Sequence, residues 1–244
     1  MAVRFEPEVG DVYRFRAEVE TEVVRTLDGE VSDQSDVAVL DATQTVRSVG
    51  DDEVLVRVEL RRDDAAPRTV DVRLDRASRL TAIDLVEGVP AEALGIDVSA
   101  DLPADITSPP TGRLEPGDRW VIDREVRIGD LPRPVTVRGR GRIDALGVED
   151  GHAVAVAVVE LEVPVRTVVG SDGGPVRLVG VQQTRSETAY DLGDGAMRRD
   201  RTTTSGDVAL IAEPPAGVQA APLLGDLRYR IVTRTARIGS TTGR

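Results

Sequence analysis

The 244-residue sequence contains no cysteine, no lysine and only one histidine, and six of its residues are aromatic. Without cysteine the chain can form neither a disulfide nor a thiolate nucleophile, and thiolate metal sites are excluded as well. One histidine is too few for an ordinary zinc site, so we expect no metal and no cofactor. So few aromatic side chains also cannot supply the stacking platforms that single-stranded nucleic acids use.

Positive charge is in the minority, with 31 basic residues against 43 acidic ones and a net charge of −12. Such a surface repels phosphate backbones. We therefore expect no nucleic-acid partner.

Long apolar runs are missing too. Residues 1–8 lack the apolar stretch of a signal peptide. No run approaches the roughly 18 to 20 apolar residues of a membrane-spanning helix. The sequence as it stands predicts a cytoplasmic protein without a transmembrane segment. If a leader has been removed, the alternative is a protein of the cell envelope or a secreted one.

The chain does contain a regular alternation of aliphatic and charged residues. Hydrophobic residues make up 40% of the chain and few are aromatic, so a core must be built from Val, Leu, Ile and Ala. The alternation covers residues 13–20, 54–60 and 70–75. A period of two predicts antiparallel strands with one buried and one solvated face. Gly and Asp separate these runs, for example at residues 28–29 and 149–151, and are typical of hairpin turns.

Two segments depart from this alternation. Residues 153–159 form an almost uninterrupted aliphatic run rich in β-branched valine, which predicts a strand covered on both faces. Residues 90–95 are the one stretch that favours a helix, and it is long enough for a single turn.

The two halves of the chain resemble each other. Gly10-Asp11 is followed closely by Tyr13, and Gly117-Asp118 is followed closely by Trp120, 107 residues further on. A later strand–turn–strand pattern also recurs, at residues 72–80 and 189–197. We therefore predict one duplicated unit. The expected parts are a first β-meander repeat at 1–88, a connector with a short helix at 89–113, a second β-meander repeat at 114–212, and a Pro-rich link and final strand at 213–244.

These observations predict an all-β, antiparallel fold with minimal helix. Each half is expected to be a meander of four or five strands. The two repeated meanders would form one curved sheet, a half-barrel or an open barrel, which the last strand closes or extends.

The Gly-Asp-x-aromatic openings and the acidic turns resemble those of a bacterial, actinobacterial-type domain family of unknown function, whose members are commonly lipid-anchored in the envelope. They are also similar to the half-barrel carriers of lipoproteins and lipids of the LolA and LppX group. This resemblance implies a curved antiparallel sheet whose concave face takes an acyl chain or another apolar ligand. It implies no catalytic residues.

Candidate catalytic residues are few. The single histidine, His152, follows an acidic turn, and no Gly-x-Ser-x-Gly motif accompanies it, so we interpret it as a surface residue at the start of a strand. Acidic residues gather at predicted turns, such as 51–53 and 149–150, where solvated charge is the expected interpretation. These features argue against an enzyme.

Six residues are candidates for ligand binding: Tyr13, Phe15, Trp120, Val154, Val156 and Val158. Tyr13 and Phe15 are expected on one strand face, and the three aromatic residues either anchor the core of each half or line a cavity between the halves. The basic cluster 198–201 is interpreted as a sheet-face or sheet-edge cluster that prevents aggregation, with contact to an anionic headgroup as the alternative.

The predicted function is a non-enzymatic binding module that holds an apolar or lipid-like small molecule in a concave β-sheet. The alternative is a structural or protein-interaction domain that contacts a protein partner through its sheet edges. A hydrolase acting through two carboxylates is ranked last.

Overall fold

The computed structural model describes residues 3–63, 65–94, 108–110, 114–126, 134–170, 174–214 and 220–243. Parts of the predicted connector 89–113 and of the Pro-rich link after residue 213 therefore lie outside the described residues.

The described elements are strands, apart from a single helical turn. The strands are β1 (Val12–Leu27), β2 (Glu30–Val49), β3 (Glu53–Arg62), β4 (Arg68–Asp75), β5 (Leu80–Val86), β6 (Val89–Pro90), β7 (Arg119–Val126), β8 (Val135–Glu149), β9 (His152–Val169), β10 (Val176–Asp191), β11 (Met197–Ala212) and β12 (Leu223–Thr241). The turn is a 3-10 helix, η1 (Ala91–Leu94), within the segment that the sequence predicts to be helical.

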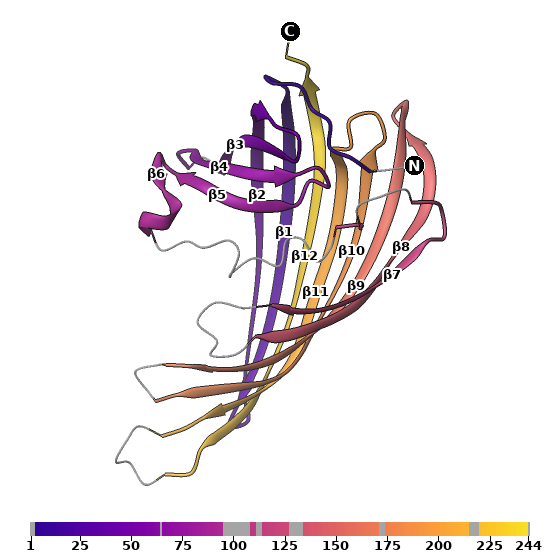
Figure 1. Cartoon of the computed structure of the whole chain (residues 1–244). Helices are drawn as coiled ribbons and strands as arrows, with labels where there is room; N and C mark the ends of the chain where they lie inside the picture. Colours follow the sequence, from indigo (N-terminus) through magenta and orange to yellow (C-terminus); the bar gives the residue numbers. More distant parts are fainter. Residues whose placement is uncertain are drawn as a thin grey trace.

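All twelve strands belong to one antiparallel sheet in the order β6-β5-β4-β3-β2-β1-β12-β11-β10-β9-β8-β7. Within each half, strands that are neighbours in the sequence pair with each other. The pairing of β1 with β12 joins the halves along the whole of β1, from Val12 to Leu27. The sheet curves into an open half-barrel, as Figure 1 shows. The predicted fold class is confirmed.

Residues 1–88 contain five described strands, β1 to β5, and residues 114–212 contain five, β7 to β11, within the four or five expected. One detail differs from the prediction. The last strand, β12, neither closes a barrel nor extends an edge, because it lies in the middle of the sheet between β1 and β11. The alternating pattern of β12 fits this central position, because the strand pairs with β1 on one side and with β11 on the other.

The turns that precede β1 and β7 share one hydrogen-bond pattern. The carboxylate of Asp11 accepts a hydrogen bond from the N–H of Glu8 at 2.8 Å, and that of Asp118 accepts one from the N–H of Glu115 at 2.7 Å. The glycine before each aspartate has a positive φ, 93° in the first turn and 90° in the second. Only glycine adopts this conformation without strain. The recurring turn supports the duplicated unit, which stays a prediction.

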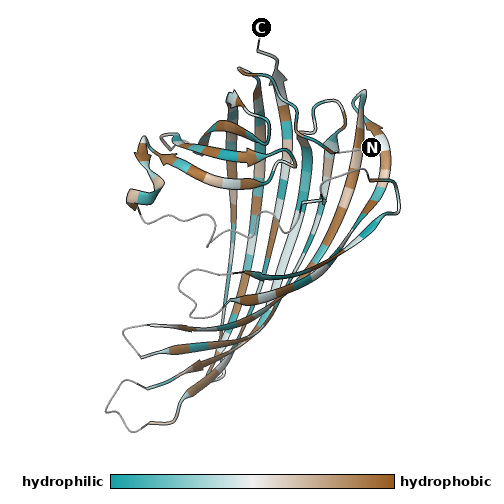
Figure 2. Cartoon of the chain, in the orientation of Figure 1, coloured by the Kyte–Doolittle hydropathy of each residue, from teal (hydrophilic) through white to brown (hydrophobic). Residues whose placement is uncertain are grey.

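The alternation along the strands separates two faces, visible as alternating colours in Figure 2. At one level of the sheet, successive cross-strand partners from β1 to β8 are Ala17, Thr235, Asp200, Thr188, Ala157 and Ile143. Directly paired residues point to the same side, so this row defines one face, here called the inner face. Tyr13 and Phe15 lie on it, four and two positions before Ala17. The opposite side is called the outer face.

Glycines show which way the sheet bends. The strand glycines with crowded surroundings all lie on the inner face, and they are Gly139, Gly141, Gly180, Gly206 and Gly225. A Cβ atom at Gly180 would lie 2.2 Å from the carbonyl oxygen of Asp207 and 2.7 Å from the Cα of Val208. Strand backbones come this close only where the sheet folds toward that side. The inner face is therefore the concave one.

Two of these glycines make room for aromatic rings. Trp120 pairs with Gly141, and Tyr229 pairs with Gly206. In each pair, ring atoms lie within 2.3 Å of the position that a Cβ on the glycine would take. The rings thus cover the glycine backbone and keep it from solvent.

We expect Gly180→Ala to lower the free energy of unfolding by about 2 kcal/mol, because the new methyl group must push β10 and β11 apart. The matched control is Gly147→Ala on β8, where a Cβ would meet only a methyl group of Val154 at 4.0 Å. Chemical denaturation of both variants measures the difference. Equal losses in the two variants would contradict the steric account of the curvature.

Candidate functional site: the inner face

One end of the inner face is apolar. The side chains there come from β1, β9, β10, β11 and β12, and they are Val19, Val23, Leu161, Val163, Leu178, Val208, Leu210, Leu227, Tyr229 and Ile231. We call this set the apolar zone. Val208 and Leu210 are only 2% and 9% exposed, whereas the other members are half-buried. A lining of this kind fits apolar groups and offers few hydrogen bonds.

The middle of the inner face carries a carboxylate surrounded by hydroxyl groups. Oδ1 of Asp200 accepts hydrogen bonds from Ser186 at 2.8 Å and from Thr188 at 2.7 Å, and Oδ2 accepts one from Thr202 at 2.8 Å. Ser186 and Thr188 are only 3% and 8% exposed. We call these four residues the hydroxyl zone. No cation pairs with Asp200 in the described part of the chain, so neutral donors alone balance its charge.

Aromatic residues fill the remaining end of the inner face. Phe5, Tyr13 and Phe15 are 3%, 3% and 5% exposed and share a core with valines of β2 and β3. The ring centroids of Phe5 and Tyr13 lie 5.9 Å apart. Tyr13 and Phe15 therefore share a face, as predicted, and they anchor a filled core.

The segment before β1 crosses this filled end. The N–H of Phe5 donates to the carbonyl of Arg76 at 2.7 Å, and the N–H of Glu6 donates to the carbonyl of Asp194 at 2.8 Å. The segment thus ties the β4–β5 turn of the first meander to the β10–β11 turn of the second. It closes this end of the concavity.

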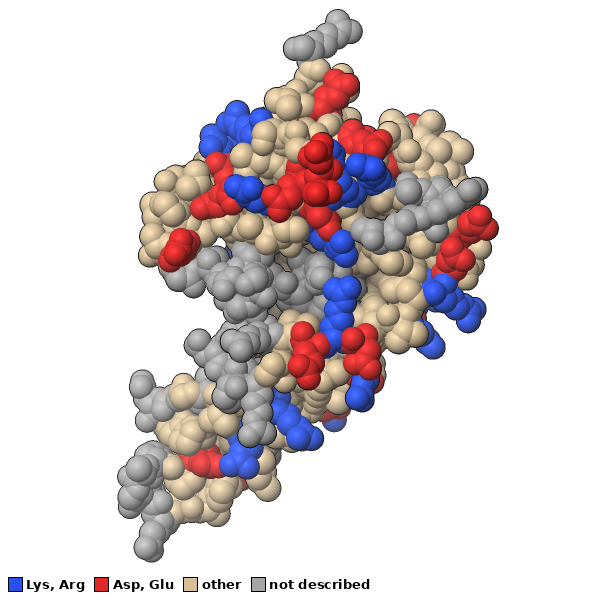
Figure 3. All heavy atoms as spheres, in the orientation of Figure 1, with Lys and Arg blue, Asp and Glu red and all other residues tan. Residues whose placement is uncertain are grey.

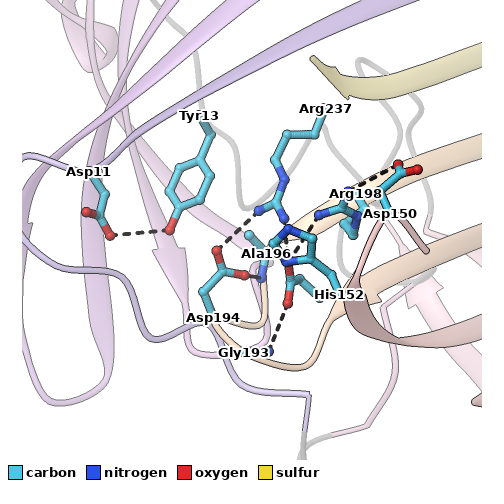
Figure 4. Close-up of polar contacts among 10 residues, drawn as sticks. Asp11, Tyr13, Asp150, His152, Gly193, Asp194, Ala196, Arg198 and Arg237 are labelled. Atoms are coloured by element: carbon cyan, nitrogen blue, oxygen red, sulfur yellow. Dashed lines mark hydrogen bonds and ion pairs between the residues drawn. The ribbon is translucent and has the colours of Figure 1, made fainter. Parts of the chain in front are cut away.

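A buried ion-pair cluster lies beside the aromatic core (Figure 4). The carboxylate of Asp191, whose side chain is 6% exposed, contacts Arg237 at 2.5 Å, Arg198 at 3.4 Å and Nδ1 of His152 at 3.0 Å. Arg237 also lies over the ring of Tyr13, 5.8 Å from its centroid. The cluster joins four strands of the second half, β9 to β12, to β1.

Two pKa values reflect this environment. Burial alone would raise the pKa of the Asp191 carboxyl, but the N–H of Gly193 and the guanidinium of Arg237 outweigh this effect and hold the pKa below its ordinary value. Burial raises the pKa of the Tyr13 phenol, as do the negative charges of Asp194 and Asp11. Tyr13 therefore stays neutral, while Asp191 stays ionised at neutral pH.

His152 is the first residue of β9, as the sequence predicts. Its side chain is 51% exposed and its partner is the Asp191 carboxylate. A catalytic triad also needs a nucleophile hydrogen-bonded to the second ring nitrogen. In the described residues His152 has no such partner, so this pair does not form a triad.

The six residues predicted to bind a ligand do not lie together. Trp120 packs on the inner face between the clusters around Val159 and Ala157. Val154, Val156 and Val158 are 1%, 9% and 2% exposed. Because Ala157 points to the inner face, these valines point to the outer face, opposite the aromatic residues. One concavity cannot be lined by both sets.

An ion-pair network lies over the outer side at this corner. Arg199 of β11 contacts Glu149 at the end of β8 at 3.0 Å and Glu187 of β10 at 3.0 Å. Strands β10 and β9 lie between β11 and β8, so the Arg199 and Glu149 side chains reach toward each other across the outer side of these two strands. The strand over residues 153–159 is covered on both sides, as predicted.

The basic cluster 198–201 lies on β11, between β10 and β12. These residues therefore lie on the face of the sheet and not at its edge, and their role in preventing aggregation stays a prediction. Arg198 and Arg199 pair with acidic residues, so the cluster is not an isolated patch of positive charge. Asp200, in the middle of this cluster, points to the inner face.

The outer face has a groove of about 780 Å³ over β8 to β11. Arg140 and Arg185 lie in it, and both pair with Glu160, at 2.7 Å and 2.5 Å. Figure 3 shows the same intermixing of both signs of charge on the surface in view. The two arginines share the one Glu160 carboxylate, and the lining as a whole has three arginines and two glutamates.

Metal and membrane signals are also absent from the described residues. No group of three or more His, Cys, Asp or Glu side chains there is arranged to hold a metal ion. None of the helices described is long and apolar enough to cross a membrane.

The hydroxyl zone was missed by the sequence analysis, although the sequence contains a signal for it. Small polar residues recur with a period of two at Thr184, Ser186 and Thr188, and again at Asp200 and Thr202. Such alternation places all of them on one face. Their pairing across β10 and β11 then brings them together.

Comparison with protein-family models gives no match, and comparison with the sequences of curated proteins gives none either. The resemblance to the LolA and LppX group therefore stays a prediction.

We expect Asp191→Asn to lower the free energy of unfolding at pH 7 by about 3 kcal/mol, because the buried Arg237 then keeps only its longer ion pair, with Asp194 at 3.2 Å. The pKa of Asp191 is lower in the folded chain than in the unfolded one. The stabilisation by Asp191 is therefore fully present above about pH 3.9, which is the pKa of this carboxyl in the unfolded chain. It is lost as the pH falls through the lower pKa of the folded chain. The difference between wild type and variant should shrink below about pH 4.

The matched control is Asp207→Asn, which removes an exposed pair with Arg228 at 3.6 Å. Its effect should stay within about 0.5 kcal/mol. Urea denaturation at pH 7 and at pH 3.5 measures both variants. A loss in Asp191→Asn that does not change with pH would contradict this account of the buried carboxylate.

Proposed function

We propose that the chain is a non-enzymatic binding module that holds an apolar or lipid-like molecule against its inner face. The observation that carries the proposal is the apolar zone, a set of half-buried aliphatic side chains on the concave side of a single-layer sheet. Sheets normally cover such a face with a second layer. Here a ligand would take that place.

Described residues outside the strands cover other parts of the inner face. Phe5 covers the aromatic end. Leu114, which is 8% exposed, packs on Ile143, Ala157 and Tyr190 beside the hydroxyl zone. The apolar zone lies further along the strands. Concave, mostly apolar surfaces with a few polar groups are typical of small-molecule sites.

The distribution of charge supports the same proposal. Ion pairs of the long strands lie on the outer face, for example Arg234 with Glu20 at 2.6 Å and Arg16 with Asp41 at 2.9 Å. The charged side is thus the one that faces solvent. The concave side is left for apolar contact.

A second candidate is a domain that contacts a protein partner through its sheet edges. Val121 on the edge strand β7 is 84% exposed, which favours this candidate. However, charged neighbours on the same strand, Arg119, Asp123 and Glu125, are typical of edges that resist pairing. A hydrolase acting through two carboxylates remains the least favoured, because Asp200 is the one acidic residue of the hydroxyl zone. The cytoplasmic location stays a prediction.

We expect wild-type protein to bind the apolar fluorophore N-phenyl-1-naphthylamine, with an increase and a blue shift of its emission. Leu178→Glu should weaken this binding by about tenfold or more, because it places a charge in the apolar zone. The matched control is Val179→Glu, the next residue of β10, which is 39% exposed on the outer face. It should bind as wild type does.

Thermal melting of both variants checks that they are folded. No binding by wild type would overturn the proposed function. Equal weakening in the two variants would show that the probe binds somewhere other than the inner face.

A further inference from the structure

We infer that the hydroxyl zone is a subsite for a positively charged, hydrogen-bond-donating head, so that the ligand is a cationic amphiphile of the alkylammonium type. This inference rests on the proposed function, since it names the polar part of the same ligand. It comes from the hydrogen-bond chemistry around Asp200.

The hydroxyl zone offers acceptors and no free donors. The hydroxyl groups of Ser186, Thr188 and Thr202 each have one proton, and each donates it to the carboxylate of Asp200. The Thr188 hydroxyl is also hydrogen-bonded to that of Tyr190 and lies 3.2 Å from the Ser186 oxygen. The acceptors left in the zone are the Thr202 oxygen and the carboxylate of Asp200. A carboxylate accepts about four hydrogen bonds, and three are in place here. A group bound at this point must therefore bring its own donors.

The charge of the zone favours a cation among such donors. Two buried carboxylates of the chain have an arginine partner, Asp71 in Arg57 at 2.7 Å and Asp191 in Arg237 at 2.5 Å. The buried carboxylate of Asp11 instead accepts from the N–H groups of Glu8 and Gly243. Asp200 has neutral partners alone in the described residues. An ammonium group has three donors and a positive charge, and it fits both properties. A carboxylate or phosphate head would be repelled.

The hydroxyl zone continues directly into the apolar zone. Thr204 lies four residues beyond Asp200 on the same face of β11, which is about 13 Å along the strand. It pairs with Ile231 of β12, and its hydroxyl is hydrogen-bonded to that of Thr184 at 3.2 Å. Thr184 in turn pairs with Leu161 of β9. An extended chain attached to a head at Asp200 would thus reach aliphatic side chains on both sides.

Three ligands with the same chain test the inference: dodecylammonium, dodecanol and dodecanoate. Each displaces N-phenyl-1-naphthylamine from the protein at pH 7, below its own micelle concentration. We expect dodecylammonium to bind wild type at least about tenfold more tightly than dodecanoate, a difference of about 1.4 kcal/mol. Asp200→Asn should bring the two affinities to within about twofold, because a neutral amide replaces the charge.

The matched control is Asp207→Asn on the same strand, where the carboxylate is exposed on the outer face. It removes the same net charge, so it corrects for the general attraction of a cation to an acidic protein. It should keep the wild-type preference. If Asp200→Asn does not melt cooperatively, Asp200→Ser replaces it, since serine also removes the charge.

The outcomes separate the two proposals. If neither the fluorophore nor any dodecyl compound binds wild type, the proposed function fails and the inference fails with it. If all three compounds bind wild type equally, or if the preference for dodecylammonium survives in Asp200→Asn, the inference alone is overturned. Loss of the preference in Asp200→Asn but not in Asp207→Asn supports it.

Discussion

The pairing of β1 with β12 is the interaction on which the rest of the structure depends. It runs from Val12 with Thr241 to Leu27 with Gly225 and turns two meanders into one sheet. The inner-face row that carries Asp200 crosses this seam between Ala17 and Thr235. The contact of Arg237 with Tyr13 crosses it as well. Without this pairing neither meander would contain a complete hydroxyl zone next to a complete aromatic core.

Curvature follows from where the side chains are small. Crowded glycines lie on the inner face alone, so the backbone can fold inward there, and Trp120 and Tyr229 cover two of the exposed backbones. The outer face carries long charged side chains, which need space and solvent. At the β8–β11 corner Arg199 reaches Glu149 across the outer side. One sheet thus has a concave apolar side and a charged outer side.

The parts of this architecture that depend on local pattern were predictable from sequence. The alternation around Tyr13, the doubly covered strand at 153–159 and the strand start at His152 are set by neighbouring residues. The position of β12 was not predictable, because both β1 and an outer edge would accept an alternating strand. The contact of Asp191 with Arg237 depends on that position and was missed for the same reason. The inward or outward direction of Val154, Val156 and Val158 was also open, because an unbroken aliphatic run does not distinguish two faces.

The hydroxyl zone shows a different limit. Alternating threonines and serines resemble the solvated side of a strand, and only the strong curvature reveals that they lie on the concave side. Their role as donors to Asp200 depends on the cross-strand register between β10 and β11. The alternation within each strand does not reveal that register, because it also depends on the bulge after Ala189, next to the β10–β11 turn.

The seam between β1 and β12 also has a consequence for how the chain is made. About 200 residues separate the end of β1 from the start of β12, and at 5 to 20 residues per second a ribosome needs about 10 to 40 s to add them. For that interval the first meander exists with one edge of β1 unpaired, and an unpaired edge can recruit a strand from another nascent chain. The charged residues along β1, such as Arg16, Glu18 and Glu20, stand on that edge throughout. During synthesis β1 must therefore resist pairing with other chains. This requirement ends once β12 pairs with it.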